Sequence, residues 1–151
     1  MSTLGSYLEA GDILLGVHAT NKQQLFEVIG KHLQTAHGVP AESVALSLQR
    51  RELAASTALG YGVAIPHARV KELERIRLVY TRLAPPLDFD GPDGLAVSEV
   101  LALLVPAPAM QEHLDVLAHV VSAIADRRFR ETLYACQDPI QVKEVFERWP
   151  Q

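Results

Sequence analysis

A nearly continuous apolar run at residues 98–107, SEVLALLVPA, constrains the fold more than any other stretch of this chain. A strand that faces solvent on one side alternates apolar and polar residues, whereas a strand covered on both faces has an unbroken apolar run. Pro106 ends the run, because proline cannot donate to a sheet's hydrogen-bond ladder. The run therefore predicts a strand that is buried on both faces of a sheet.

The segments around this strand interleave strand-like and helix-like patterns. A short strand is predicted at 11–17. A second strand is predicted at 75–83, because apolar and polar residues alternate there. Residues 84–94, APPLDFDGPDG, are typical of a turn-rich connection. Helices are predicted at 20–38, 40–56, 110–126 and 138–149. The 151 residues are thus expected to form one α/β domain spanning 1–151, a mixed sheet flanked by helices.

Helix ends and faces follow from residue spacing. Thr20 and Gln23 have the spacing of a capping box, Gly38 is a natural stop, and Asp138 with Pro139 suits the start of the last helix. The expected inward faces are Leu25, Val28, Ile29 and Leu33; Val44, Leu48 and Leu53; Leu114, Leu117, Val121 and Ile124; and Val142, Val145, Phe146 and Trp149.

Charge and cysteine content exclude several classes of protein. The formal net charge is −4 and the one notable basic cluster is at 127–130, so a nucleic-acid partner is not expected. The single cysteine, Cys136, forbids an internal disulfide, suits a reducing cytoplasm and is expected to be a small buried hydrophobe. No run reaches eighteen apolar residues, so membrane insertion is not expected, and the acidic N-terminus is unlike a signal peptide.

The octet GYGVAIPH at 60–67 combines two glycines, a short apolar run, a proline and a histidine. A nucleotide-binding loop is rejected, because Ile65 stands where a third glycine belongs and Pro66 would obstruct the following helix. A metal site has little support: His113 and His119 are six residues apart on one helix and so point in different directions. His67 and His113 could still meet in space with a carboxylate.

The third interpretation is a histidine that carries a phosphoryl group. Neutral imidazole is a good nucleophile near pH 7. Gly60 and Gly62 would let backbone N–H groups approach phosphate oxygens, and Pro66 would limit where His67 can point. The plain alternative is that the two glycines only make a turn and that His67 is an ordinary surface histidine.

The longer segment STALGYGVAIPH at 56–67 resembles the active-site motif of the fructose/mannitol-type enzyme IIA family of the bacterial phosphoenolpyruvate:sugar phosphotransferase system. Ser56, Thr57, the two glycines, Pro66 and His67 match, while Ala58 stands where that family usually has glycine. A second block, LALLVPAPAMQEHLDVLAHV, resembles the family's buried strand, turn and following His-Leu helix, and RRELAAS resembles its Arg-Glu pair. The family's mixed-sheet fold is then expected.

The resemblance implies a role for each matching residue. His67 is the phosphoryl acceptor, His113 a hydrogen-bond donor that faces it, and Arg51 a charge partner of the phosphate, with Arg50 as the alternative. The donor would be a histidine phosphocarrier protein (HPr-like) that is itself charged by an enzyme I. No cofactor or metal is needed if histidine, arginine and backbone donors neutralise the phosphoryl oxygens.

Length and motifs are most similar to the family's nitrogen-regulatory branch (enzyme IIA-Ntr). Its members regulate transporters, sensor kinases or metabolic enzymes according to their phosphorylation state. The alternative is a free-standing fructose- or mannitol-type sugar IIA that passes phosphate to a IIB protein. More distant alternatives are a binding module that is never phosphorylated and a metallohydrolase.

Overall fold

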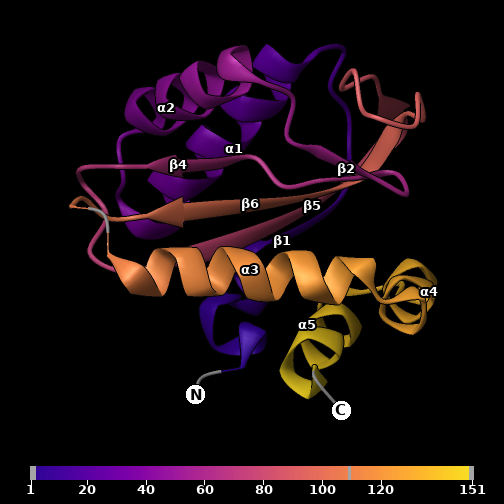
Figure 1. Ribbon diagram of the computed structural model, residues 1–151. Coiled ribbons are helices and arrows are strands. Elements are labelled where there is room, and N and C mark those ends of the chain that lie inside the picture. The colour runs from indigo at the N-terminus through magenta and orange to yellow at the C-terminus, as the bar shows by residue number, and fades with distance from the viewer. Residues whose placement is uncertain (1–2, 109, 150–151) are drawn as a thin grey trace.

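The computed structural model describes residues 3–108 and 110–149, which form a mixed six-stranded sheet with helices on both faces (Figure 1). The strands are β1 Ile13–Val17, β2 Ala58–Gly60, β3 Val63–Ala64, β4 His67–Arg69, β5 Arg77–Leu87 and β6 Val97–Val105. The helices are the short 3₁₀ segments η1 Leu4–Tyr7 and η2 Ala10–Asp12, and α1 Lys22–His37, α2 Ala41–Ala54, α3 Gln111–Ala125, α4 Arg127–Ala135 and α5 Pro139–Arg148. The predicted α/β fold class is confirmed.

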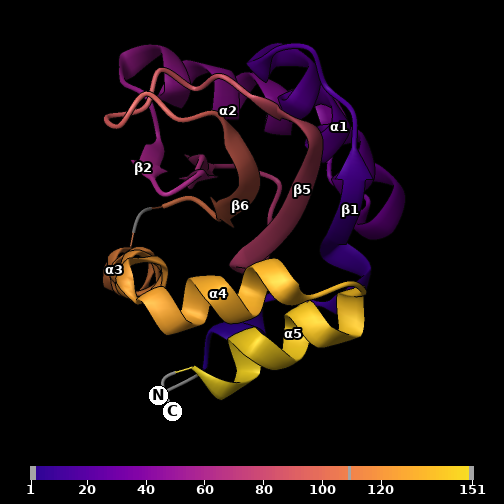
Figure 2. The same cartoon turned by 90° about the vertical axis from the view of Figure 1, so that its right-hand side faces the viewer.

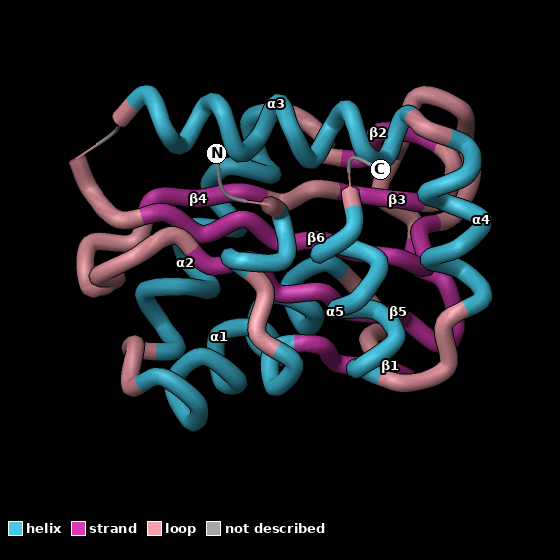
Figure 3. The backbone as a smooth tube through the Cα atoms, turned by 90° about the horizontal axis from the view of Figure 1, so that it is seen from below, coloured by secondary structure: helices cyan, strands magenta, loops and turns pink. Residues whose placement is uncertain are grey.

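Strand β6 lies at the centre of the sheet, and it is buried on both faces, as its apolar sequence predicted. The strand order is β1-β5-β6-β3-β2, and β4 also pairs with β6. Strands β3 and β4 follow each other along the same edge of β6, both parallel to it, as Figure 3 shows. The antiparallel pairing of β5 with β6 and the parallel pairing of β1 with β5 make the sheet mixed.

Two hydrophobic cores lie on opposite faces of the sheet. Helices α1 and α2 cover one face, while α3, α4, α5 and the N-terminal 3₁₀ segments cover the other (Figures 1 and 2). Side chains of β6 alternate between them: Leu101 and Leu103 join the core under α3 to α5, and Ala102 and Leu104 join the core under α1 and α2. This alternation is why the β6 segment from Val100 to Val105 is apolar at every position.

Several local predictions need correction. The N-cap of α1 is Asn21, whose side chain accepts from the Gln24 N–H, so Thr20 is not the cap. Strand β5 continues to Leu87, into the segment that was predicted to be turns. The expected inward residues Leu53, Leu114 and Val121 are 87%, 61% and 40% exposed.

Other local predictions are confirmed. Gly38 ends α1 in the left-handed conformation, and Asp138 caps α5 ahead of Pro139. Cys136 is a buried free thiol, and burial raises its pKa. Among the described helices, none combines the length and the apolar character that a bilayer span requires.

Candidate functional site

A cavity of about 690 Å³ lies where α2, β4, the end of β6 and the start of α3 meet. The ionisable residues that line it are Arg50, Arg51, His67, Arg69 and His113. No described lining residue is Asp or Glu, so the charge of the cavity wall is positive. A second cavity of about 640 Å³, between α4 and α5, contains none of the residues predicted to form the site. The first cavity therefore has the character of an anion site.

His67 opens β4, and both of its ring nitrogens have partners. Nδ1 lies 2.9 Å from the carbonyl oxygen of Ile65, and Nε2 lies 3.1 Å from Nε of Arg51. A carbonyl only accepts and a guanidinium only donates, so Nδ1 carries the proton and Nε2 carries the lone pair. Both contacts indicate the same neutral tautomer. The imidazole therefore presents its nucleophilic nitrogen on the side where Arg51 lies.

The backbone around Pro66 determines where this ring stands. The Pro66 carbonyl accepts from the Leu103 N–H at 2.9 Å, and His67 pairs in register with Leu103 of β6. Ile65 is buried, and its N–H donates to Thr57 O at 3.0 Å. The junction between β3 and β4 is thus attached to β6 on one side and to the 56–58 segment on the other.

Arg51 comes from the last turn of α2 and reaches the histidine across the cavity. Its Nη1 also donates to the Ala55 carbonyl at 3.0 Å, which holds the guanidinium near the helix end. Arg50 lines the same cavity, but the described contact with His67 belongs to Arg51. Both arginines therefore contribute charge, and Arg51 is the one positioned against the ring.

His113 lies in the first turn of α3 and is 8% exposed. Its Nδ1 accepts from the Met110 N–H at 3.3 Å, so the proton of the neutral ring is on Nε2. The start of a fifteen-residue helix also carries partial positive charge from its free backbone N–H groups. The α3 end of the cavity thus offers a ring donor and a helix N-terminus, both suited to an anion.

Ser56 and Thr57 do not line the cavity; their hydrogen bonds hold the 56–58 segment, which pairs with the residues that precede His67. Buried Glu52 accepts from the Thr57 hydroxyl at 2.6 Å and from the Thr57 N–H at 3.1 Å, and pairs with Lys22 at 2.7 Å. The Ser56 hydroxyl bonds to the Phe89 carbonyl and accepts from the Ala58 N–H. The Glu that follows Arg51 in the sequence therefore supports the 56–58 segment and does not line the cavity.

Gly60 ends β2 and Gly62 lies in the turn that leads to β3, and neither belongs to the residues that line the cavity. Both have positive φ angles, +99° and +77°, which glycine adopts freely. The Tyr61 N–H between them donates to the Asp93 carboxylate at 3.0 Å, so a side chain of this protein already occupies that position. Their placement explains the glycines by turn geometry and gives no support to the idea that they cradle phosphate.

Arg69 and Met110 line the cavity and were not singled out from the sequence. Arg69 was within reach of sequence reasoning, because residues two apart on a strand share a face and His67 is two positions earlier. Met110 could not be found that way, since its place depends on how α3 packs. His119, on the same helix as His113, is not among the lining residues.

Comparison with known proteins gives one consistent result. Residues 6–149 match the family described as phosphoenolpyruvate-dependent sugar phosphotransferase system, EIIA 2. A nitrogen regulatory protein of Bradyrhizobium diazoefficiens is 34% identical over 133 residues, which is 88% of this chain and 87% of that protein.

Two solved structures extend the comparison. The nitrogen regulatory protein IIA-Ntr of Neisseria meningitidis superposes with a TM-score of 0.87 at 34% identity, covering 94% of this chain and 97% of that one. The IIA mannitol protein of Escherichia coli shares the fold at a TM-score of 0.75 and 22% identity, covering 91% and 97%.

Proposed function

Because this chain belongs to the EIIA type 2 family of the phosphoenolpyruvate-dependent sugar phosphotransferase system, we propose that Nε2 of His67 accepts a phosphoryl group from a phosphohistidine of a carrier protein. The observation that carries this proposal is the Nδ1–H tautomer of His67, which leaves the Nε2 lone pair at an arginine-lined cavity. The carrier would be an HPr-like protein charged by an enzyme I.

The transfer balances without a separate base. A PO₃⁻ unit leaves one neutral imidazole and joins another, so the N–P bond of the carrier breaks as the bond to Nε2 forms. The proton on Nδ1 of His67 stays in its hydrogen bond to Ile65 O throughout. Positioning and charge stabilisation then account for most of the rate, as is usual in phosphoryl transfer.

Arg51 has to change partner during this step. Its Nε–H donates to the lone pair that would attack, so the guanidinium must release Nε2 and turn to the incoming oxygens. Charge-assisted hydrogen bonds to a dianion are stronger than the bond to a neutral ring, which favours the exchange. Arg50, Arg69 and the Nε2–H of His113 would complete the neutralisation.

Exposed apolar side chains at the rim of the cavity suit the docking of a protein. Met110 and Leu114 are 60% and 61% exposed and line the cavity beside His113. Apolar side chains next to positive charge favour a partner surface with an apolar patch and a bound anion. A phosphorylated carrier protein has that chemistry.

We further propose that this protein acts as a phosphorylation-dependent regulator and not as a component of sugar uptake. Its support is the similarity, at 34% identity over most of both chains, to proteins named as nitrogen regulators. Phosphorylation adds one and a half to two negative charges at about pH 7, in the middle of a surface on which a partner would dock. A partner that packs against neutral His67 would be repelled, whereas one that presents an arginine there would be attracted.

The direct test of phosphorylation combines the purified chain with an enzyme I, a carrier protein and phosphoenolpyruvate. Intact-mass spectrometry should show one added phosphoryl group, and ³¹P or ring ¹⁵N NMR should place it on Nε2 of His67. A chain that gains no mass while the carrier is fully charged would overturn the proposal.

The regulatory role predicts that partner binding depends on the phosphorylation state. Wild-type protein held in the phosphorylated or the unphosphorylated form should capture different transporter subunits, sensor kinases or metabolic enzymes from native lysate. His67→Ala should behave as the unphosphorylated form under both conditions. If the specific partner is instead a sugar IIB protein that receives phosphate from His67 at a useful rate, the sugar-transport alternative replaces the regulatory one.

Replacing His113 with alanine should slow phosphoryl transfer without abolishing it. A charge-assisted hydrogen bond contributes about 1.5–3 kcal/mol, which corresponds to a loss of about one to two decades in rate. Rapid-quench measurement of transfer from the carrier checks this. His113→Gln should recover part of the rate because it keeps a donor, and His119→Ala, on the same helix but outside the cavity, should match wild type. An unchanged rate in His113→Ala would remove this residue from the site.

A further inference from the structure

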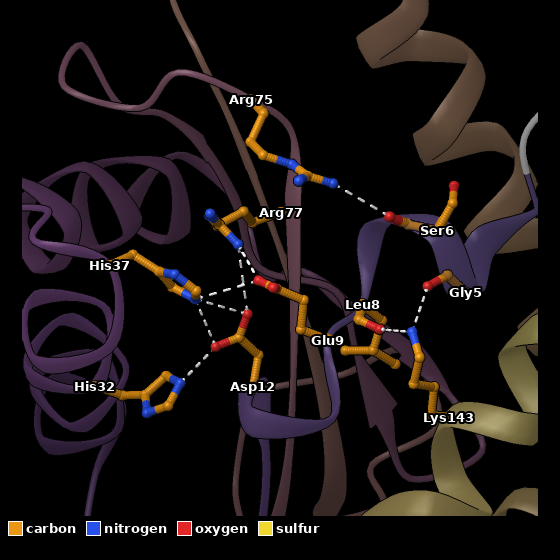
Figure 4. A network of polar contacts seen from close by, with 10 residues as sticks. All are labelled: Gly5, Ser6, Leu8, Glu9, Asp12, His32, His37, Arg75, Arg77 and Lys143. Atoms are coloured by element: carbon orange, nitrogen blue, oxygen red, sulfur yellow. Dashed lines mark hydrogen bonds and ion pairs between the residues drawn. The ribbon is translucent and has the colours of Figure 1, made fainter.

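A second group of ionisable side chains lies away from the phosphoryl site, between η2, α1 and the start of β5 (Figure 4). Its centre is Asp12, which is 1% exposed. Nε2 of His32 lies 2.7 Å from Asp12 Oδ1, and Nε2 of His37 lies 2.9 Å and 3.0 Å from its two oxygens. Glu9 and Arg77 complete the group, which we call the Asp12 cluster.

Three of these side chains, Glu9, Asp12 and His37, have the geometry of a metal site, and His32 bonds to Asp12. Nε2 of His37 is 3.6 Å from Glu9 Oε2, and the ligand atoms of Glu9, Asp12 and His37 all lie within 4.8 Å of one another. Two ligands of a tetrahedral zinc ion, each at about 2.0–2.1 Å, are about 3.3 Å apart. The His37–Asp12 and His37–Glu9 pairs, at 2.9 to 3.6 Å, lie within a few tenths of an ångström of that separation.

The charges of the cluster also favour a cation. Two carboxylates face one guanidinium: Arg77 bonds to Glu9, and its Nη1 is 3.8 Å from Asp12 Oδ2. With both imidazoles neutral, one negative charge remains uncompensated beside a buried carboxylate, which is costly. His37 is the last residue of α1, where the free carbonyls of the helix attract positive charge.

The side chains of His32 and His37 are 17% and 16% exposed, and that of Glu9 is 52% exposed. An ion from solvent can therefore reach the side chains that surround the buried carboxylate of Asp12. An imidazole with two carboxylates suits zinc and its neighbours in the first transition series better than calcium or magnesium, which prefer oxygen ligands alone. We propose that Glu9, Asp12 and His37 form a binding site for a divalent transition metal of the zinc class, separate from the phosphoryl site, with His32 as the hydrogen-bond partner that orients Asp12.

Binding at this site would connect three parts of the fold. Glu9 and Asp12 belong to the N-terminal segment, the two histidines belong to α1, and Asp12 directly precedes β1. Nε2 of the neutral His37 ring donates to Asp12, because a carboxylate only accepts, so metal binding through Nε2 requires that proton to move to Nδ1 through water, with no net loss. A metal bound to the folded chain alone would raise its melting temperature.

The test uses zinc chloride and the full chain at pH 7.5. Titration calorimetry should show one strong site per chain, and long-range ¹H–¹⁵N spectra of the histidine rings should show metal-bound Nε2 for His37. His37→Gln should weaken the affinity by about tenfold or more, since even the partners that orient metal ligands contribute 10- to 100-fold. His18→Gln, an exposed histidine outside the cluster, is the matched control.

Arg77→Gln should have the opposite effect to His37→Gln and tighten zinc binding, because it removes a competing positive charge from both carboxylates. The ring spectra of the wild-type protein make the test independent of whether His37→Gln folds well. Zinc that perturbs only His67 and His113, or a His37 ring that responds to protons but not to zinc, would overturn the proposal.

Discussion

Replacing His67 with alanine should leave a folded protein that takes up no phosphoryl group. The side chain supplies the nitrogen that we propose as the nucleophile of the positively charged cavity, and its removal costs the described hydrogen bonds to Ile65 O and to Arg51. Both of those partners lie at a partly exposed site, where water can replace the lost bonds at a cost of about 0.5–1.5 kcal/mol each. Intact mass after incubation with enzyme I, carrier and phosphoenolpyruvate measures the effect on uptake.

Circular dichroism and the unfolding midpoint provide the folding control for His67→Ala. His119→Ala is the matched histidine replacement and should be phosphorylated as wild type is. An adduct of normal stoichiometry on His67→Ala would contradict the assignment. An adduct located on His113 in that variant would mean that the two histidines have the opposite roles.

Replacing Arg82 with methionine should lower the free energy of unfolding by about 3–5 kcal/mol, more than any other replacement proposed here. That is the usual cost of leaving a buried partner charge unpaired. Glu99 is 3% exposed, and its carboxylate accepts from Nε of Arg82 at 3.1 and 3.2 Å. The guanidinium also donates to the Cys136 and Leu133 carbonyls at 2.6 and 2.9 Å. Methionine keeps much of the side-chain volume but removes the guanidinium from Glu99 and from both carbonyls, so the buried carboxylate loses its opposite charge.

Tyr80 makes the Arg82 network still harder to replace. Arg82 donates to the Tyr80 hydroxyl at 3.0 Å, and burial, reinforced by the Glu99 carboxylate, raises the pKa of that hydroxyl above its usual range. Tyr80 therefore stays neutral: it can hydrogen-bond to Glu99 but brings no positive charge to it. The positive charge of Arg82 is the nearest one that the described contacts place against Glu99.

Urea unfolding followed by circular dichroism measures the effect of Arg82→Met. Arg127→Met is the matched control, because Arg127 pairs with Glu131 on the surface, with side chains 82% and 62% exposed, and such pairs contribute about 0–1 kcal/mol. Equal midpoints for the two variants would show that Glu99 finds another partner. Below its melting temperature Arg82→Met should still be phosphorylated, since Arg82 does not line the cavity.

The predicted site residues differ in how far the sequence alone could place them. The order of residues in the octet predicted a histidine held in place by proline, and the structure puts His67 at a cavity with Arg51 and His113. The expected role of Gly60 and Gly62 was less well founded. Positive φ angles suit a phosphate loop and a β-turn equally, and the position of the turn relative to the cavity depends on strands distant in the chain.

Helix faces show a similar limit. Leu114 and Val121 have the spacing of core residues, but the α3 side chains that are buried include His113, Val116 and Val120. The apolar stripe of α3 is wide enough to allow more than one rotation against the sheet, and packing against β6 and η1 selects one of them. That rotation turns His113 inward and leaves Leu114 at the rim of the cavity.

The sequence by itself determined the mixed α/β class, the buried central strand and the local backbone at Pro66 and His67, because each depends on residues that are neighbours in the chain. Tertiary structure alone decided which side chains meet across elements. Arg51 meets His67 because α2 packs beside β4, and His32 and His37, about 140° apart on a regular helix, converge because Asp12 is buried between them. Such contacts depend on how whole elements are placed relative to one another. Burial of the two cores determines that placement, and it cannot be read from the spacing of residues within one element.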